Sequence, residues 1–356
     1  MTWDALYAGM SRRRCAICGQ MAIVAEQLDM CLACIRRATP EAAERVVSAH
    51  TRAREPFGMP VRPPRAAGGA QCRLCVNQCQ IGEGEKGYCG SKTNRQGRIQ
   101  HLWGAGTGLL DWYYDPIPTN CVAAWICGAR HDYGCRNLAV FLRACSFDCL
   151  YCQNWHFKAG RRPRPMTAAD LATRADSLTS CICYFGGDPA PQAPYSLLAA
   201  RLALARRRAR PLRICWETNG SENPAVMRTM GKLALTSGGT IKIDLKAIDD
   251  RLHQALTGSS NTWTLENIRL LAAMMPNARS APPLLVVSTL LVPGYVDADE
   301  VAAIARFLAA LNPSIPYALL AFHPQFLMAD LPPTSRQHAQ ACHQAAIAAG
   351  LTQARL

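Results

Sequence analysis

From residue 137 onward the sequence alternates between short apolar runs rich in β-forming residues and longer stretches with helical periodicity. The apolar runs cover residues 137–144, 181–185, 212–216, 240–245, 284–290 and 317–322. Helical stretches such as TAADLATRADSL, NPAVMRTMGKLAL and ADEVAAIARFLAAL separate them, and a last one follows at 335–350. Strands that alternate with helices are joined by parallel crossover connections. The pattern therefore predicts an α/β fold with six parallel strands, closed or partly closed into a barrel.

The polar and glycine-rich motifs of this region all follow the predicted strands at the same end. CSFDCLYC follows the first strand, FGGDP the second and ETNG the third, while IDLK closes the fourth and HPQF follows the sixth. In barrels of parallel strands the active site is built at the C-terminal ends of the strands. We therefore expect these motifs to meet at one mouth of the barrel and to form a single site.

The segment CSFDCLYC places Cys145, Cys149 and Cys152 within eight positions. A compact loop with these spacings can wrap a 4Fe–4S cluster, each thiolate holding one iron, so that the fourth iron lacks a protein ligand. An open coordination position is how metal sites bind and activate a small molecule. The alternative is that Cys135 supplies a fourth ligand, which would make a closed cluster or a zinc site.

This CxxxCxxC spacing, with the aromatic Tyr151 before the last cysteine, resembles the signature of the radical S-adenosylmethionine (radical SAM) superfamily. The resemblance extends over residues 136–330 and implies a partial (β/α)6 radical SAM barrel, preceded by small Cys-rich metal-binding segments. It also implies a 4Fe–4S cluster whose unique iron chelates SAM. One electron then cleaves SAM, and the resulting 5′-deoxyadenosyl radical abstracts hydrogen from a substrate.

The resemblance also assigns candidate cofactor-binding residues at the strand ends. Two glycines leave a strand edge free of side chains, so that backbone carbonyls can approach the ammonium group of SAM. The family often shows GGEP where this chain has GGDP, and ETNG offers oxygens for the ribose or a cation, with strand-end turn chemistry as the alternative. The candidates are Tyr151, Gly186, Gly187, Asp188, Glu217, Thr218, Asn219, Asp244, Lys246 and His323.

The stretch IKIDLKAID puts Lys242, Asp244 and Lys246 on one face of a strand. Charged side chains in a barrel lining need ligands or mutual pairing to offset their burial. The stretch resembles the activating-enzyme branch, exemplified by pyruvate formate-lyase activating enzyme. That likeness implies that Glu217 and Asp244 serve SAM and a monovalent cation, although Glu217 replaces the aspartate of that branch.

Two further cysteine groups precede the barrel region. Two CxxC pairs, separated by twelve residues, predict a zinc ribbon, with a second iron–sulfur cluster as the alternative: Cys15, Cys18, Cys31 and Cys34. A second group with spacings x2, x3 and x9 suits either a closed zinc site or a second cluster: Cys72, Cys75, Cys79 and Cys89. The role of Cys121, Cys127 and Cys135 is left open, and isolated cysteines are taken as core residues.

The predicted organisation has five parts. They are a zinc-ribbon-like segment (1–38), a helix and Pro/Gly-rich linker (39–69), a second Cys-rich segment with an extension (70–135), the barrel (136–330) and a C-terminal helix (331–356). Together with FHPQFLMADLPPTS, the second Cys-rich segment resembles AmmeMemoRadiSam-type, activating-enzyme-like proteins.

The likeness to activating enzymes, together with the N-terminal metal-binding segments, implies a protein or peptide as the hydrogen donor, and a reduced flavodoxin- or ferredoxin-type protein as the electron donor. A cobalamin-assisted C-methyltransferase acting on a protein is the alternative, although the DxHxxG pattern of cobalamin-binding domains is absent from the sequence. A non-catalytic electron-transfer or zinc-binding protein is a third reading, in which the strand-end motifs have no evident purpose.

The composition of the chain indicates the cellular compartment and the kinds of partner to expect. Eighteen cysteines without an apolar export signal are typical of metal binding in a reducing cytoplasm, and no stretch predicts a membrane span. The formal net charge of +14, with arginine runs at 12–14, 161–164 and 206–210, favours an acidic partner or is simply a solvated basic face. These runs lack interleaved aromatic residues, so nucleic-acid binding is not supported beyond charge.

Overall fold

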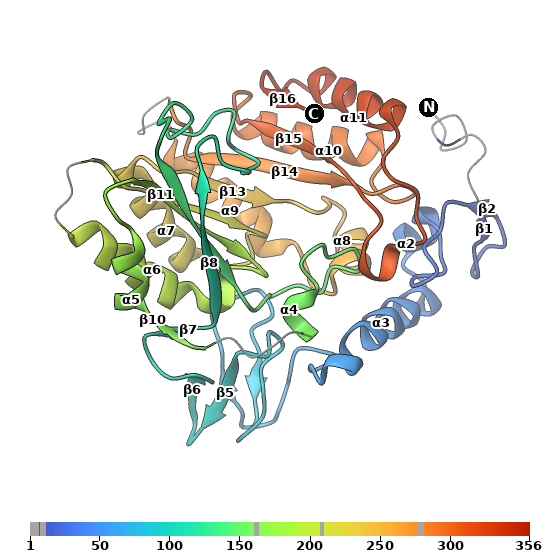
Figure 1. Cartoon of the computed structure of the whole chain (residues 1–356). Helices are drawn as coiled ribbons and strands as arrows, with labels where there is room; N and C mark the ends of the chain where they lie inside the picture. The colour runs from blue at the N-terminus through green and yellow to red at the C-terminus, as the bar shows by residue number, and fades with distance from the viewer. Residues whose placement is uncertain (1–6, 8–11, 160–163, 207–209, 276–280) are drawn as a thin grey trace.

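The computed structural model describes residues 7, 12–159, 164–206, 210–275 and 281–356 (Figure 1). Its centre is an eight-stranded sheet with the strand order β16-β15-β14-β13-β12-β11-β9-β8. The sheet strands are β8 (Leu110–Pro116), β9 (Arg136–Leu142), β11 (Thr179–Gly186), β12 (Arg213–Thr218), β13 (Ile241–Asp244), β14 (Leu285–Leu291), β15 (Tyr317–Ala321) and β16 (Ala354–Arg355). All neighbours pair in parallel except β8, which runs antiparallel to β9.

Helices follow most of these strands and cover the outer face of the sheet (Figure 1). They are α5 (Ala168–Arg174), α6 (Ala193–Ala205), α7 (Pro224–Ser237), α8 (Asp250–Thr257), α9 (Thr262–Met274), α10 (Ala298–Leu311) and α11 (Arg336–Ala348). Several begin at an N-cap side chain that accepts a backbone N–H, as at Asp249, Asp297 and Ser335. Such caps satisfy donors that the first helical turn leaves free.

The alternation of side chains along the strands separates the core from the site. On β13, Ile241 and Ile243 are fully buried on the helix-covered side, whereas Lys242 and Asp244 line a pocket on the opposite side. Successive side chains of a strand point to opposite faces of the sheet, so the apolar residues hold the helices while the polar ones face inward. The strand order thus places the polar residues of neighbouring strands beside one another.

The N-terminal part is built from short elements. They are β1 (Arg13–Arg14), β2 (Met21–Ala22), α2 (Leu32–Arg37), α3 (Pro40–Arg54), β3 (Ala70–Gln71), β4 (Gln80–Ile81), β5 (Lys92–Arg95), β6 (Arg98–His101) and β7 (Thr107–Gly108), which pairs with β10 (Met166–Thr167). Short 3-10 helices at Glu55–Phe57, Ala190–Gln192 and Phe326–Met328, and α4 (His156–Ala159), complete the described elements.

The ribbon of β1, β2 and α2 docks on the start of α10. Arg36 of α2 reaches Glu300 with Nη2 2.7 Å from Oε2, and the backbone N–H of Ala25 donates to the hydroxyl of Tyr295 at 2.9 Å. Gly294 has no room for a side chain, since a Cβ there would stand 2.4 Å from the carbonyl oxygen of Ile23. The ribbon is therefore a packed part of the molecule.

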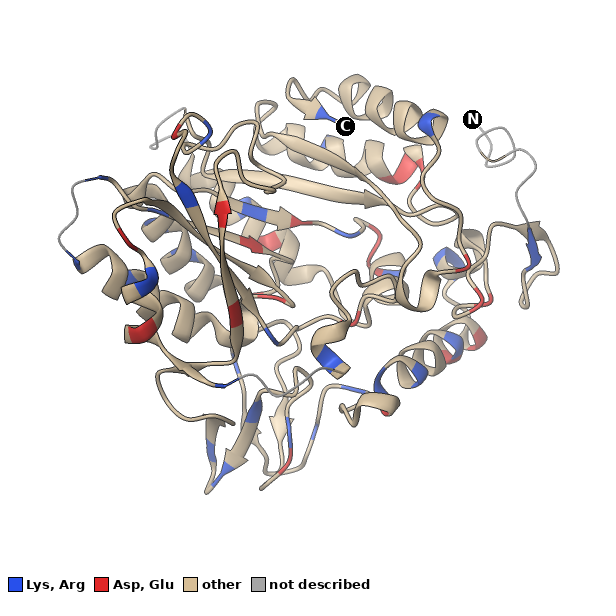
Figure 2. Cartoon of the chain, in the orientation of Figure 1, with Lys and Arg blue, Asp and Glu red and all other residues tan. Residues whose placement is uncertain are grey.

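The structure confirms the predicted α/β class and the six parallel strands in chain order. It also adds two strands to the sheet: β8 comes before the predicted barrel range of 136–330, and β16 comes after it. Lys and Arg residues are distributed over many elements, from α3 and the β5–β6 hairpin to α11 (Figure 2). Residues 161–163 and 207–209 of the predicted arginine runs lie outside the described residues.

Candidate active site

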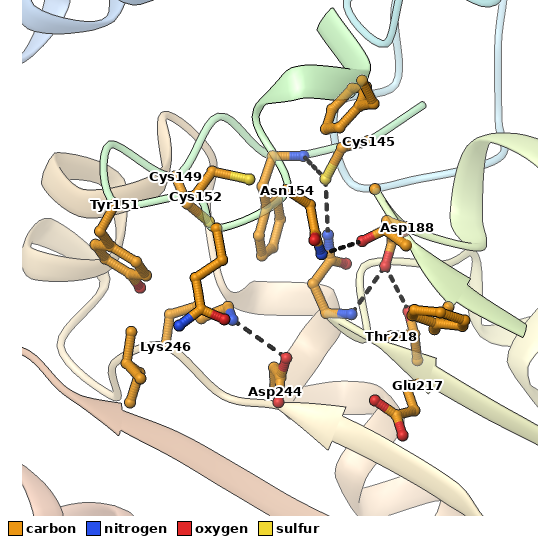
Figure 3. A pocket seen from close by; sticks show the side chains of 18 of the residues that line it. Cys145, Cys149, Tyr151, Cys152, Asn154, Asp188, Glu217, Thr218, Asp244 and Lys246 are labelled. Carbon is orange, nitrogen blue, oxygen red and sulfur yellow. Dashed lines mark hydrogen bonds and ion pairs between the residues drawn. The ribbon is translucent and has the colours of Figure 1, made fainter. Parts of the chain in front are cut away.

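A cavity of about 260 Å³ opens at the carboxyl ends of the parallel strands. The strand-end motifs of the first four strands all contribute side chains or backbone to its lining, together with Leu290 of β14 and Leu320 of β15 (Figure 3). The structure therefore brings together most of the residues that the sequence singled out.

The loop after β9 carries the three cysteines of the CxxxCxxC motif, and all three line the cavity. Neighbouring segments hold the loop through its backbone: the N–H of Asp148 donates to the carbonyl of Thr257 at 2.8 Å, and that of Leu150 to Leu256 at 3.0 Å. Burial raises the pKa of Cys149 to about 12. Metal ligation requires the thiolate, so a bound metal centre would have to displace the proton that burial otherwise keeps on this thiol.

A buried carboxylate lies between the first two cysteines of that loop. The Nδ1 atom of His50 is 3.0 Å from Oδ2 of Asp148, Nη1 of Arg54 is 3.4 Å from Oδ1, and the ammonium of Lys158 also contacts Oδ1. Burial alone would raise the pKa of Asp148, but its His50 hydrogen bond and the charges of Lys158 and Arg54 lower it to about 2.

Sequence reasoning missed this network, although one signal was present. His50 and Arg54 are four residues apart in the predicted helix and therefore share a face. Nothing in the sequence indicates which carboxylate that face meets. Because α3 follows the ribbon directly, Asp148 joins the N-terminal part of the chain to the cysteine loop.

Gly186 and Gly187 end β11 against the end of β9. Gly186 has φ +113°, and a Cβ on Gly187 would stand 2.3 Å from the carbonyl oxygen of Ala144. These positions therefore require glycine because the two strand ends approach closely. Their carbonyls remain at the cavity, where Asn154 Nδ2 donates to Gly186 O at 3.3 Å.

Asp188 organises the loops at this edge. One of its carboxylate oxygens, Oδ1, accepts the hydroxyl of Thr218 and the backbone N–H of Asn219, each at 2.9 Å, and Oδ2 accepts the N–H of Ala190 at 2.8 Å. Burial raises the pKa of Asp188 to about 6 in spite of these donors. Asn219 in turn donates from Nδ2 to Ser146 Oγ at 2.8 Å and lies 3.9 Å from the sulfur of Cys145. The second and third strand ends thus support the cysteine loop.

Glu222 is a further buried acid that the sequence did not single out. Its Oε1 lies 2.6 Å from the hydroxyl oxygen of Thr218. A hydroxyl group has one hydrogen to donate, and the hydroxyl of Thr218 donates it in the hydrogen bond to Asp188. Burial, followed by the charge of Asp188, raises the pKa of Glu222 to about 8, so Glu222 is protonated near neutral pH and donates to Thr218.

The floor of the cavity holds alternating charges from β12 and β13. Lys242 Nζ lies 2.7 Å from Glu217 Oε2 and 3.6 Å from Asp244 Oδ1, and Lys246 Nζ lies 3.2 Å from Asp244 Oδ2. Burial opposes ionisation of Asp244, but the two ammonium groups outweigh it and lower the pKa of its carboxyl. A monovalent cation between Glu217 and Asp244 would have to displace the ammonium of Lys242.

Tyr151 bears on the question of a bound nucleotide. Its ring is buried edge-on against Phe322, with centroids 6.4 Å apart, and the residue lines the cavity. Among the described residues its hydroxyl has no hydrogen-bond partner. Buried hydroxyls are normally paired, so an unpaired one at a cavity wall indicates a polar ligand. Together with the charged floor, the lining fits a zwitterionic nucleoside such as SAM.

His323 does not reach this cavity. It follows β15 as predicted, but it is exposed, it is not among the lining residues, and its Nδ1 lies 3.3 Å from the carbonyl oxygen of Pro324. The chain turns away after β15, which directs Leu320 inward and leaves His323 at the surface.

The four cysteines of the ribbon converge. Cys15 and Cys34 have their sulfurs 3.8 Å apart, as do Cys18 and Cys31, and all four sulfurs lie within 4.8 Å of one another. A tetrahedron with Zn–S bonds of 2.3 Å has an edge of about 3.8 Å. The ligand atoms therefore fit one tetrahedral metal ion. No other set of three or more such ligand atoms this close occurs among the described residues.

The second Cys-rich segment packs against the cysteine loop. Asn77 donates from Nδ2 to the carbonyl of Ser146 at 2.6 Å, and the N–H of Val76 donates to the carbonyl of Ser221 at 2.9 Å. The four thiols of the segment are not within 4.8 Å of one another, in contrast to those of the ribbon.

Part of the chain is similar to one known family. Residues 139–308, just under half of the chain, match the family described as the Radical SAM superfamily. Several of the similar proteins are named as activating enzymes. None of the helices in the described ranges has the length and apolar character needed to span a bilayer.

Three relatives illustrate the range of similarity. An uncharacterized protein of Methanocaldococcus jannaschii is 26% identical over 295 residues, 79% of this chain and 79% of its own length. The isethionate sulfite-lyase activating enzyme of Oleidesulfovibrio alaskensis is 32% identical over 139 residues, 39% of this chain and 40% of that enzyme. The pyruvate formate-lyase-activating enzyme of Staphylococcus aureus is 25% identical over 198 residues, 52% of this chain and 73% of that enzyme.

Proposed function

We propose that the protein is an activating-enzyme-like radical SAM enzyme that abstracts hydrogen from a protein or peptide. The observation that carries this proposal is the meeting of three cysteine thiols, the unpaired hydroxyl of Tyr151 and a charge-balanced floor in one cavity. Cys145, Cys149 and Cys152 would hold a 4Fe–4S cluster, and the remaining lining would hold SAM. The chemistry supplied by these bound groups is one-electron cleavage of SAM to a hydrogen-abstracting 5′-deoxyadenosyl radical.

The chain's own residues would bind and orient SAM. Carbonyls at Gly186 and Gly187 can accept hydrogen bonds from an ammonium group, and Lys246 can donate to a carboxylate. Tyr151 can donate its free hydroxyl hydrogen to a nucleoside oxygen. The network of Asp188, Thr218 and Asn219 would hold the cysteine loop against the strand ends, since Asn219 contacts Ser146 within that loop.

A macromolecular substrate is supported by the similarity to activating enzymes, and by the N-terminal segments that pack beside the cysteine loop. An electron donor of the flavodoxin or ferredoxin type would reduce the cluster. The net charge of +14 favours such a donor, since electrostatic attraction speeds the encounter of a basic protein with an acidic partner.

SAM cleavage is tested by anaerobic reconstitution with iron and sulfide, reduction with dithionite and measurement of 5′-deoxyadenosine after SAM is added. The unchanged protein and a Cys342→Ala control should form it, because Cys342 is buried in α11 away from the cavity. Cys149→Ala should form none above background. Equal amounts from Cys149→Ala, or none from cluster-loaded protein, would contradict the proposal.

The substrate class is tested with extract from cells grown in deuterated medium. Deuterium should enter 5′-deoxyadenosine when the macromolecular fraction retained by dialysis is added. Deuterium transfer that depends only on the dialysable fraction would show that the substrate is a small molecule.

A further inference from the structure

Six cysteines outside the three groups described above gather behind the wall of the cavity, and one of them, Cys135, lies just before β9 in the same buried cluster as Cys127 and Cys181. Cys181 and Cys183 lie on β11, Cys215 lies on β12, and Cys121 and Cys127 belong to the segment between β8 and β9. Phe185 and Glu217 line the cavity and stand two residues beyond Cys183 and Cys215. Since side chains two apart on a strand share a face, these thiols point to the same interior as the cavity lining.

The thiols are close neighbours across three segments of the chain. Cys183 and Cys215 are direct partners in the register of β11 and β12, which sets their backbones about 4.8 Å apart. The thiols of Cys183 and Cys121 are in hydrogen-bond contact. Cys127 belongs to the same buried cluster as Cys181. Residues far apart in sequence therefore supply sulfur to one place.

The surroundings are not those of an ordinary apolar core. Glu217 Oε1 lies 4.0 Å from the sulfur of Cys183, and the ammonium of Lys242 binds the other oxygen of Glu217. The positive charge of Arg213 acts on both Cys127 and Cys181. Each of these cations is paired with a carboxylate, Lys242 with Glu217 and Arg213 with Asp132, so the thiols lie among paired charges.

Two neighbouring cysteines have other partners. The thiol of Cys181 donates to Asn137 Oδ1 at 3.3 Å, and the sulfur of Cys135 accepts from Nη1 of Arg210 at 3.2 Å. The other four sulfurs remain for ligation.

We propose that Cys121, Cys127, Cys183 and Cys215 bind an iron–sulfur cluster inside the barrel. Among the described residues, no three of these sulfurs lie within 4.8 Å of one another, whereas the four sulfurs of the ribbon do. In a polynuclear cluster the thiolates bind different iron atoms, which places their sulfurs farther apart than around a single ion.

The proposed centre would lie directly behind the cavity. Val122, next to Cys121, and Glu217, in contact with Cys183, both line the cavity wall. This inference uses none of the cysteines assigned to the radical SAM cluster, so it can hold or fail independently of the proposed function.

The test uses a variant in which Cys145, Cys149 and Cys152 are replaced by alanine. Its iron and sulfide contents are measured after anaerobic reconstitution. Adding Cys183→Ala and Cys215→Ala should lower the iron content by about two to four per chain, according to cluster type. Adding Cys342→Ala instead should leave it unchanged. The half-buried loop variant Cys121→Ala serves as a second probe in case the strand variants fold poorly, which circular dichroism and melting would reveal.

Electron paramagnetic resonance of the dithionite-reduced protein should show a signal that disappears with the iron in the Cys183/Cys215 variant. Iron content equal to that of the Cys342 control would overturn the proposal, as would zinc in place of iron at these thiols. SAM cleavage by the Cys183/Cys215 variant with an intact CxxxCxxC loop reports separately on the proposed function.

Discussion

The carboxylate of Asp148 offers the sharpest test of how the N-terminal part supports the cysteine loop. Asp148→Asn keeps the size and shape of the side chain but removes the negative charge that three basic groups share. Arg54 is fully buried and Lys158 has only 2% of its side chain exposed, so neither can turn to water. The substitution would leave these charges without their counter-ion.

The loss of stability depends on which interaction partners each cation keeps after the substitution. Removing one partner of a buried ion pair typically destabilises a protein by about 3 to 5 kcal/mol. Arg54 still donates to the carbonyls of Pro60 and Tyr88, and its guanidinium lies 3.6 Å from the centroid of the Tyr88 ring. We therefore expect the lower end of this range, about 3 kcal/mol. The matched control, Asp111→Asn, breaks a surface pair with Arg143 and should cost less than about 1 kcal/mol.

Equilibrium urea unfolding of zinc-loaded, cluster-free protein measures both changes. The double variant Asp148→Asn with Lys158→Met should recover part of the loss, because it removes one of the uncompensated charges. If Asp148→Asn lies within about 1 kcal/mol of the unchanged protein, and Lys158→Met gives no recovery, the carboxylate is not the electrostatic centre of the loop.

Two further predictions concern pH and metal. Burial lowers the pKa of His253 to about 4 against 6.5 when unfolded, so stability should fall by up to roughly 3 kcal/mol as pH drops from 6.5 to 4. Urea unfolding at pH 7 and 5 measures this dependence of the unfolding free energy on pH. It should become weaker in His253→Gln but not in His323→Gln, whose residue lies at the surface. An equal pH dependence in both variants would refute the assignment. Zinc analysis should find about one ion per chain held by the ribbon and lost in Cys18→Ser, with faster proteolysis of residues 12–37; unchanged zinc would contradict it.

The order of the barrel strands could be predicted because each strand carries its own evidence. An apolar β-rich run followed by a helical stretch is a local pattern, and parallel connection rules then give the neighbours. β8 escaped prediction because only Leu110 of LDWYYDP is buried, so this edge strand lacks the continuous apolar run of the parallel strands. β16 is two residues long, too short to leave a pattern in the sequence.

The site was predictable to the extent that its residues follow strands directly. Thr218 and Glu217 are neighbours in one motif, yet the structure directs Thr218 to Asp188 and Glu217 to Lys242. His50 and Arg54 reach Asp148 from almost a hundred residues away, and no local pattern reveals such contacts. The barrel cysteines were individually indistinguishable from core thiols, and only the register of β11 and β12 places two of them side by side.

The helix α3 has a consequence for any attempt to divide this chain into separate modules. Trimming away everything before residue 70 would preserve the whole CxxxCxxC loop and its cavity, but it would discard His50 and Arg54. The helix α3 is therefore a structural support of the cysteine loop and not only a connection between the ribbon and the sheet. Any shortened or chimeric version of the enzyme has to carry this helix, or a substitute for its two basic side chains, if the loop is to keep its shape.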